Sequence, residues 1–177
     1  MNRFTVLAVF LLALSSPTSS YAQLGLYSFG PRVGKDVVSG DDTRTFFMFQ
    51  ADVAQLWSPR ILLEVAGETG SGVDLAGQDV EVAGGSTIFK YYWVNKTKNA
   101  YAFTGGGFGV NRFRRFLSGG FRTETDTSIH FVLLGMERHV FQKRAKGVLD
   151  IRWLIGNIEG ASALRVGLGV SYLLKSP

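Results

Sequence analysis

Apolar and polar residues alternate with a period of two along most of this chain. In GVLDIRWLIG, residues 147–156, one side of the alternation carries Leu149, Ile151 and Trp153, and the opposite side carries Asp150 and Arg152. Side chains of a β-strand point alternately to opposite faces, so this pattern predicts a strand between apolar and polar surroundings. The pattern alone leaves open which face lies against which solvent.

Alternation and turn residues divide the chain into eight predicted strands. Their approximate bounds are Leu24–Lys35, Thr45–Trp57, Arg60–Gly70, Val82–Val94, Ala100–Phe113, Ser128–Phe141, Gly147–Gly156 and Ala161–Leu174. These are longer than typical globular strands and long enough for a tilted strand to cross a bilayer, which takes about 9–11 residues. An even number of strands, starting at eight, is also typical of closed bacterial membrane barrels.

The predicted connections alternate between short and long. Ser58-Pro59, Asn95–Asn99 and Gln142–Lys146 are short, whereas Lys35–Arg44, Ser71–Glu81 and Arg114–Thr127 are long and polar. Membrane barrels have brief periplasmic turns and longer external loops, so the long connections are predicted to lie outside the cell. The last connection, Asn157–Gly160, is predicted on the same side although it is short.

The size of the side chains decides which face meets lipid. The apolar faces carry Trp, Tyr, Phe and Leu, too bulky for the narrow interior of eight strands, whereas the polar faces are rich in Gly, Ala and Ser. We therefore predict an all-β fold, an eight-stranded antiparallel up-and-down transmembrane β-barrel with its apolar faces in lipid.

Charged residues recur on the polar faces, five acidic and four basic. Buried charges persist only when they are paired and hydrogen-bonded. We therefore expect a polar network that closes the lumen, formed by Arg32, Asp52, Glu64, Glu68, Lys90, Glu137, Asp150, Arg152 and Arg165.

The N-terminal segment predicts the cellular compartment. Arg3, the apolar run Phe4–Leu14 and the small residues up to Ala22 predict a cleaved secretory signal peptide at residues 1–22, which leaves residues 23–177 as the barrel domain. The sequence has no cysteine, so the exported chain has no disulfide bonds. The formal net charge of +5 is scattered, too weak a signal to indicate nucleic-acid binding.

The signal peptide, the eight amphipathic strands and YAFTGGGFGVNRF (101–113), which leads into an external connection, resemble the small outer-membrane β-barrel protein family. That family includes the membrane domain of outer-membrane protein A and the opacity-type adhesins. The resemblance implies a monomer in the cell outer membrane, inserted by the barrel-assembly machinery, with a role in envelope integrity, adhesion or small-solute transport. The chain departs from the family at its end, where Tyr172 is followed by Leu-Leu-Lys-Ser-Pro.

Four arginines crowd the third long connection: Arg112, Arg114, Arg115 and Arg122. Arginine binds phosphate through two parallel hydrogen bonds, so one hypothesis is contact with the phosphates of lipopolysaccharide. The alternative is a solvated loop with ordinary surface charges.

Two further functions remain open. Ser128 and His130 are predicted on the lipid face, at the height where a lipid A deacylase carries a serine–histidine pair, although that family has the order His-x-Ser and no acid is assigned here. An outer-leaflet hydrolase or acyltransferase is therefore one alternative, and a soluble periplasmic lipid-binding barrel is another. We expect a protein that is not an enzyme and has no metal or other cofactor.

Overall fold

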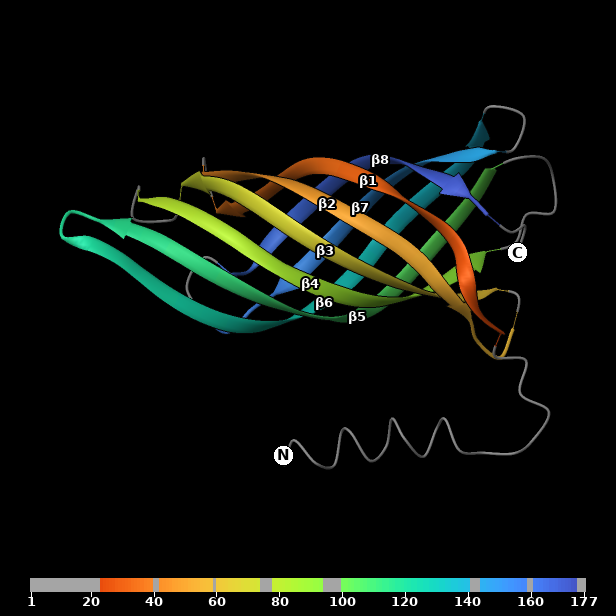
Figure 1. Cartoon of the computed structure of the whole chain (residues 1–177), viewed down its shortest axis with the longest axis horizontal. Helices are drawn as coiled ribbons and strands as arrows, with labels where there is room; N and C mark the ends of the chain where they lie inside the picture. Colours follow the sequence, from red (N-terminus) through yellow and green to blue (C-terminus); the bar gives the residue numbers. More distant parts are fainter. Residues whose placement is uncertain are drawn as a thin grey trace.

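The computed structural model describes residues 23–39, 42–58, 60–73, 78–93, 100–140, 144–158 and 161–174. The predicted signal peptide, the turn 95–99 and Phe141 lie outside the described residues. Eight strands form a closed barrel (Figure 1). They are β1 (Gln23–Ser39), β2 (Asp42–Gln55), β3 (Ile61–Val73), β4 (Asp79–Trp93), β5 (Ala100–Leu117), β6 (Gly120–Val140), β7 (Ala145–Ile155) and β8 (Ala163–Leu173).

Each strand pairs antiparallel with its neighbours in sequence, and β1 pairs antiparallel with β8 to close the barrel. This order confirms the predicted up-and-down eight-stranded fold. In the described part of the chain, no helix is long and apolar enough to cross a membrane.

The two ends of the barrel differ. One carries the start of β1, the end of β8 and the connections β2–β3, β4–β5 and β6–β7, and we call it the terminal end. The other, the hairpin end, carries the remaining four connections. The β5–β6 hairpin projects beyond all other strands at the hairpin end (Figure 1).

The connections at the hairpin end are shorter than the sequence predicted. Most of the polar segment Arg114–Thr127 is paired strand, because β5 and β6 stay in register as far as Leu117 and Gly120. In the second half of the segment, Phe and Thr residues alternate with charged residues, which is a pattern typical of a β-strand. The strand pairing therefore continues through this segment. As a result β6 has 21 residues.

Apolar side chains cover the outside of the barrel, and the interior contains charged and polar side chains together with apolar clusters that include Ile88 and Phe103. On β8, Leu164, Val166 and Leu168 are 42–61% exposed, whereas Arg165 is 3% exposed. Two aromatic residues near the hairpin end, Phe46 and Phe113, also point inward and are each 3% exposed. They lie at inward positions of β2 and β5, because strand parity rather than height along the barrel decides their direction.

Candidate functional site

Among the described residues, the buried carboxylate of Asp126 accepts hydrogen bonds from Asn157 near the hairpin end. Twelve other charged side chains of the barrel interior form three successive groups of four. The nine residues predicted from the sequence are all among them and are 0–8% exposed. Asp36, Arg44 and Lys146, which lie in segments predicted to be connections, complete the set and are each 4% exposed. Each group contains two acids and two bases, so each is neutral at pH 7.

The middle group consists of Arg32, Glu64, Asp150 and Arg152. The Arg152 guanidinium donates from Nε to Asp150 Oδ2 at 2.7 Å and from Nη2 to Glu64 Oε1 at 2.8 Å. Arg32 donates to Asp150 and lies 3.5 Å from Glu64 Oε2. Gly167 faces this group, and a Cβ there would lie 3.0 Å from both Arg32 and Asp150, so the missing side chain leaves room for the ion pair.

The group nearer the terminal end consists of Asp52, Lys90, Glu137 and Lys146. Lys146 Nζ donates to Asp52 at 2.7 Å and to Glu137 at 2.8 Å, and Lys90 Nζ donates to the same two carboxylates at 2.8 and 3.3 Å. Lys90 also lies 2.8 Å from Glu64 and so connects this group to the middle one.

The group nearer the hairpin end consists of Asp36, Arg44, Glu68 and Arg165. Arg165 donates from Nε to Asp36 Oδ1 at 2.6 Å and also binds Glu68, while Arg44 lies 3.7 Å from Asp36. The Arg165 guanidinium lies over the Phe46 ring, 4.2 Å from its centroid. The inward aromatic side chain thus packs against the charged group that it covers.

These contacts fill the interior with side chains that hold one another in place. Removing a charge from water is costly and is offset only when partners and hydrogen bonds replace the water. Within the described residues each of the twelve charges has an oppositely charged partner within 4.0 Å. The arrangement cross-links strands far apart in sequence. In the described part of the chain, no group of three or more His, Asp or Glu side chains could hold a metal ion.

The prediction that Ser128 and His130 face lipid is wrong. Both point into the barrel, 3% and 0% exposed, and the Ser128 hydroxyl lies 2.8 Å from His130 Nε2. The cause is an irregularity in β6 between Val132 and Leu134, where the register with β7 shifts by one residue. Leu133 and Leu134 both point outward there, so residues before and after this β-bulge have opposite parity.

The four arginines of the β5–β6 hairpin fall on two faces. Arg112 and Arg114 are exposed on the outer wall of the barrel. Arg115 and Arg122 lie on the other face of the hairpin, where both bind Glu124, Arg122 at 2.6 Å. The structure therefore separates these arginines into an outer pair and an ion-paired pair.

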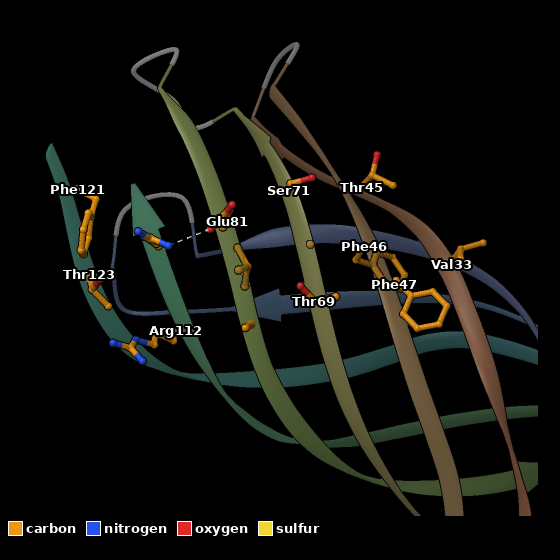
Figure 2. A pocket seen from close by; sticks show the side chains of 14 residues that line it. Val33, Thr45, Phe46, Phe47, Thr69, Ser71, Glu81, Arg112, Phe121 and Thr123 are labelled. Carbon is orange, nitrogen blue, oxygen red and sulfur yellow. Dashed lines mark ion pairs between the residues drawn. The ribbon is translucent and has the colours of Figure 1, made fainter. Parts of the chain in front are cut away.

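The outer pair borders a groove of about 880 Å³ on the barrel wall at the hairpin end. Figure 2 shows its mixed lining: Val33, Phe47 and Thr45 lie at one side, Thr69 lies in the middle, and Thr123 lies at the other side beside Arg112. Arg114 lies 3.8 Å from Glu81, and its guanidinium is stacked 4.1 Å from the centroid of the Phe121 ring. The groove therefore combines cationic, hydroxyl and apolar surfaces.

Comparison with known proteins identifies the fold. No protein-family model matches the chain, and no curated protein matches it. Among solved structures, Neisserial surface protein A (NspA) is similar with a TM-score of 0.68 at 14% identity, over 86% of this chain and 99% of that one. The N-terminal β-barrel domain of Pseudomonas aeruginosa OprF is similar with a TM-score of 0.55 at 12% identity, over 85% and 98% of the two chains. Ail, the attachment invasion locus protein of Yersinia pestis, gives 0.50 at 11%, over 85% and 99%. The chain has the fold of the small eight-stranded outer-membrane β-barrels.

Proposed function

We propose that this chain is a bacterial outer-membrane barrel protein without enzymatic activity, whose lumen is closed and whose hairpin end contacts lipopolysaccharide outside the cell. A signal peptide at residues 1–22 directs export, and the barrel-assembly machinery inserts residues 23–177. The exposed hairpins serve surface contact, adhesion or envelope integrity. The observation that carries the proposal is the combination of an apolar exterior with an interior of three neutral charge groups.

The exterior supports insertion into a membrane. Large apolar side chains around the barrel wall are exposed, among them Phe49, Phe131 and Leu168 at 43–61%. An exposed apolar surface of this extent indicates contact with lipid or protein. A soluble barrel that carries a lipid would need the reverse arrangement, with an apolar cavity inside, whereas this interior contains Lys90 and Arg152 at 0% exposure.

The ion-paired side chains in the barrel interior support a closed lumen. Barrels with a water-filled channel have roughly sixteen or more strands, and eight strands leave an interior that side chains fill. Planar-bilayer recording of the purified protein should show no steady conductance of porin size, with a sixteen-stranded porin as the positive control. Steady channels of that size would refute the closed lumen.

The position of Ser128 argues against the alternative function of a lipid hydrolase. A hydrolase of outer-leaflet lipids needs its nucleophile at the lipid face, and Ser128 lies on the interior side of β6 at 3% exposure. Mass spectrometry of lipid A from cells that carry the Ser128→Ala variant should match that from cells with the unaltered protein. An altered acylation pattern would favour the enzyme.

The outer arginine pair supports the contact with lipopolysaccharide. Arg112 and Arg114 border a groove that also offers hydroxyls for sugars and Phe47 for an acyl chain. Guanidinium groups bind phosphate in bidentate fashion, and we assign that contact to the outer pair because Arg112 and Arg114 border the groove, whereas Arg115 and Arg122 lie on the other face of the hairpin and bind Glu124.

The test is binding of purified lipopolysaccharide to the barrel in detergent micelles. Replacing Arg112 and Arg114 together by Ala should weaken binding by about tenfold, the equivalent of about 1.4 kcal/mol. Arg138 and Arg144, both exposed at the terminal end, provide the matched control, and replacing both by Ala, which removes the same charge, should leave the affinity unchanged. Equal losses in the two variants would show that binding depends on net charge alone.

A further inference from the structure

Among the described residues, no strand lies beside one edge of β6 over its first nine residues. Pairing with β5 extends as far as Gly120, whereas pairing with β7 begins only at Ile129. Among the described residues, the other contact along this stretch comes from Asn157, which hydrogen-bonds to Asp126 and Thr127. The edge from Gly120 to Thr125 is therefore open, and it belongs to the hairpin that projects furthest from the barrel (Figure 1).

The hydrogen bond from Asn157 indicates which backbone N–H and C=O groups of β6 point toward the open edge. Its Nδ2 donates to the Thr127 carbonyl at 3.0 Å, so the backbone groups of Thr127 point toward the open edge. In an antiparallel ladder the residues whose N–H and C=O point to a given side alternate along the strand. The groups of Phe121, Thr123 and Thr125 therefore face the same open edge, available to another extended chain.

The side chains beside this edge carry opposite charges at a spacing of two. Arg122 is 68% exposed and Glu124 is 23% exposed, and both lie on the face of the hairpin opposite the groove. Thr123 stands between them. Such a segment is complementary to its own copy when the two run in opposite directions.

We propose that the open edge of β6 pairs antiparallel with the same edge of a second copy of this chain, centred on Thr123. In this register Thr123 lies opposite its counterpart, and Arg122 of each copy lies opposite Glu124 of the other. Glu124 already contacts Arg115 and Arg122 of its own chain, and in the pair Arg122 of the second copy becomes a further cationic neighbour. Cross-strand pairs of opposite charge stabilise a sheet, and like charges directly opposite destabilise it.

Neighbouring registers are less favourable for the same reason. Centring the pair on Arg122 or on Glu124 places like charges face to face, and centring it on Thr125 sets Glu124 opposite Asp126. The charge pattern thus selects one register of the strand pair.

The symmetry of the pair determines where the second copy lies. Two antiparallel copies of one strand are related by a rotation of 180° about an axis perpendicular to the sheet. Because the hairpin projects along the length of the barrel (Figure 1), this rotation turns the second barrel to point in the opposite direction. The pairing therefore joins barrels in two facing membranes, and each copy remains a monomer within its own membrane. This step rests on the proposed outward orientation of the hairpin end.

Cysteine crosslinking tests the register, because the chain has no cysteine of its own. Directly opposite residues of an antiparallel pair have Cα atoms about 5.5 Å apart or less, within the range that a disulfide spans. Under mild oxidation, the purified Thr123→Cys variant in detergent micelles should form disulfide-linked dimers. Thr69→Cys is the matched control, since Thr69 is exposed on β3, which has a paired strand on both sides, and it should stay monomeric. Equal dimer yields from the two variants, or none from Thr123→Cys, would overturn the proposal.

Charge reversal tests the complementarity. In the Thr123→Cys background, Arg122→Glu and Glu124→Arg should each lower the dimer yield by about tenfold, because each places like charges opposite one another. A mixture of the two charge-reversed proteins should restore the yield, since each then presents the charge that the other lacks. A mixture that crosslinks no better than either variant alone would refute the pairing.

Vesicles and cells separate this inference from the proposed function. If the edge pairs as described, two populations of phosphatidylcholine vesicles with the hairpin end outward should adhere on mixing, and adhesion should be lost with Arg122→Glu. The Thr123→Cys protein could form dimers in micelles but no crosslinks between intact cells. That result would contradict the outward orientation of the hairpin end and would leave the strand pairing supported. An adduct between Thr123→Cys and a different cell-surface protein, in place of the homodimer, would refute a second copy as the partner.

Discussion

At the scale of single residues, Arg152 shows how a buried charge is held inside the barrel. Its side chain is fully buried and binds Asp150 and Glu64 at once, while each carboxylate also contacts Arg32. The guanidinium suits this position because its donors form a planar fork and reach two carboxylates together. Removing it would leave two buried acids with Arg32 and Lys90 as the remaining cations.

The Arg152→Ala variant should therefore lose about 3–5 kcal/mol of unfolding free energy, the usual cost of breaking a buried ion pair from one side. Urea unfolding of the barrel in detergent micelles, followed by the mobility of the folded band on a gel, measures this loss. Arg122→Ala removes an exposed arginine and should change stability by less than about 0.5 kcal/mol. Similar values for the two variants would contradict the importance assigned to the interior ion pairs.

Part of this interior could be predicted from single residues and part could not. Arg32, Asp150 and Arg152 lie in clear alternation, so their parity alone predicted that they share the interior. Asp36 and Lys146 lie within stretches that resemble connections in sequence, and their role depends on how far the strands continue. That length is set by cross-strand pairing, which one strand's sequence does not contain.

At the scale of elements, β7 and β8 form a wall with strictly separated faces. Leu168 is 61% exposed in the middle of β8 and pairs with Val33 and Leu149 on its two sides, all pointing outward. Alternation predicted these faces correctly because both strands are regular. In β6, by contrast, the bulge at Leu133 and Leu134 reverses the parity of Ser128 and His130. Two consecutive leucines carry no signal of a bulge in the sequence.

The Leu168→Arg variant tests the lipid contact of this wall. A cation at the middle of the bilayer should destabilise the barrel by about 2–4 kcal/mol, and one near the interface by about 0–1 kcal/mol. Leu164 faces the same side nearer the hairpin end, so Leu164→Arg should cost less. Unfolding in lipid vesicles measures both variants. Equal and negligible costs would indicate that this face meets water.

At the scale of the whole molecule, the two ends of the barrel make the orientation testable. The chain has no cysteine, so a single introduced thiol reports its own location. Ser118, in the turn of the β5–β6 hairpin, and Arg144, next to the start of β7, are both exposed and lie at opposite ends. In intact cells a membrane-impermeant maleimide should label the Ser118→Cys variant at once.

The Arg144→Cys variant should be labelled only after the cells are opened, because the terminal end is proposed to face the periplasm. The reverse pattern would invert the orientation, and labelling of both variants in intact cells would argue against a membrane-spanning barrel. The overall architecture was the most predictable level, since eight amphipathic strands with one oily face each have few ways to close other than a barrel.

The seam between β1 and β8 has a consequence for how the barrel is built. Arg32 and Asp36 lie on the first strand, whereas their partners Asp150 and Arg165 lie on the last two, 118 and 129 residues away. When only the first six strands have assembled, Arg32 and Asp36 still lack these two partners. Closing the seam supplies these partners in one step, so the final stage of assembly gains ion pairs that no earlier hairpin can form. Partly assembled barrels should therefore be too unstable to accumulate. The protein should convert between the unfolded chain and the closed barrel without a populated intermediate.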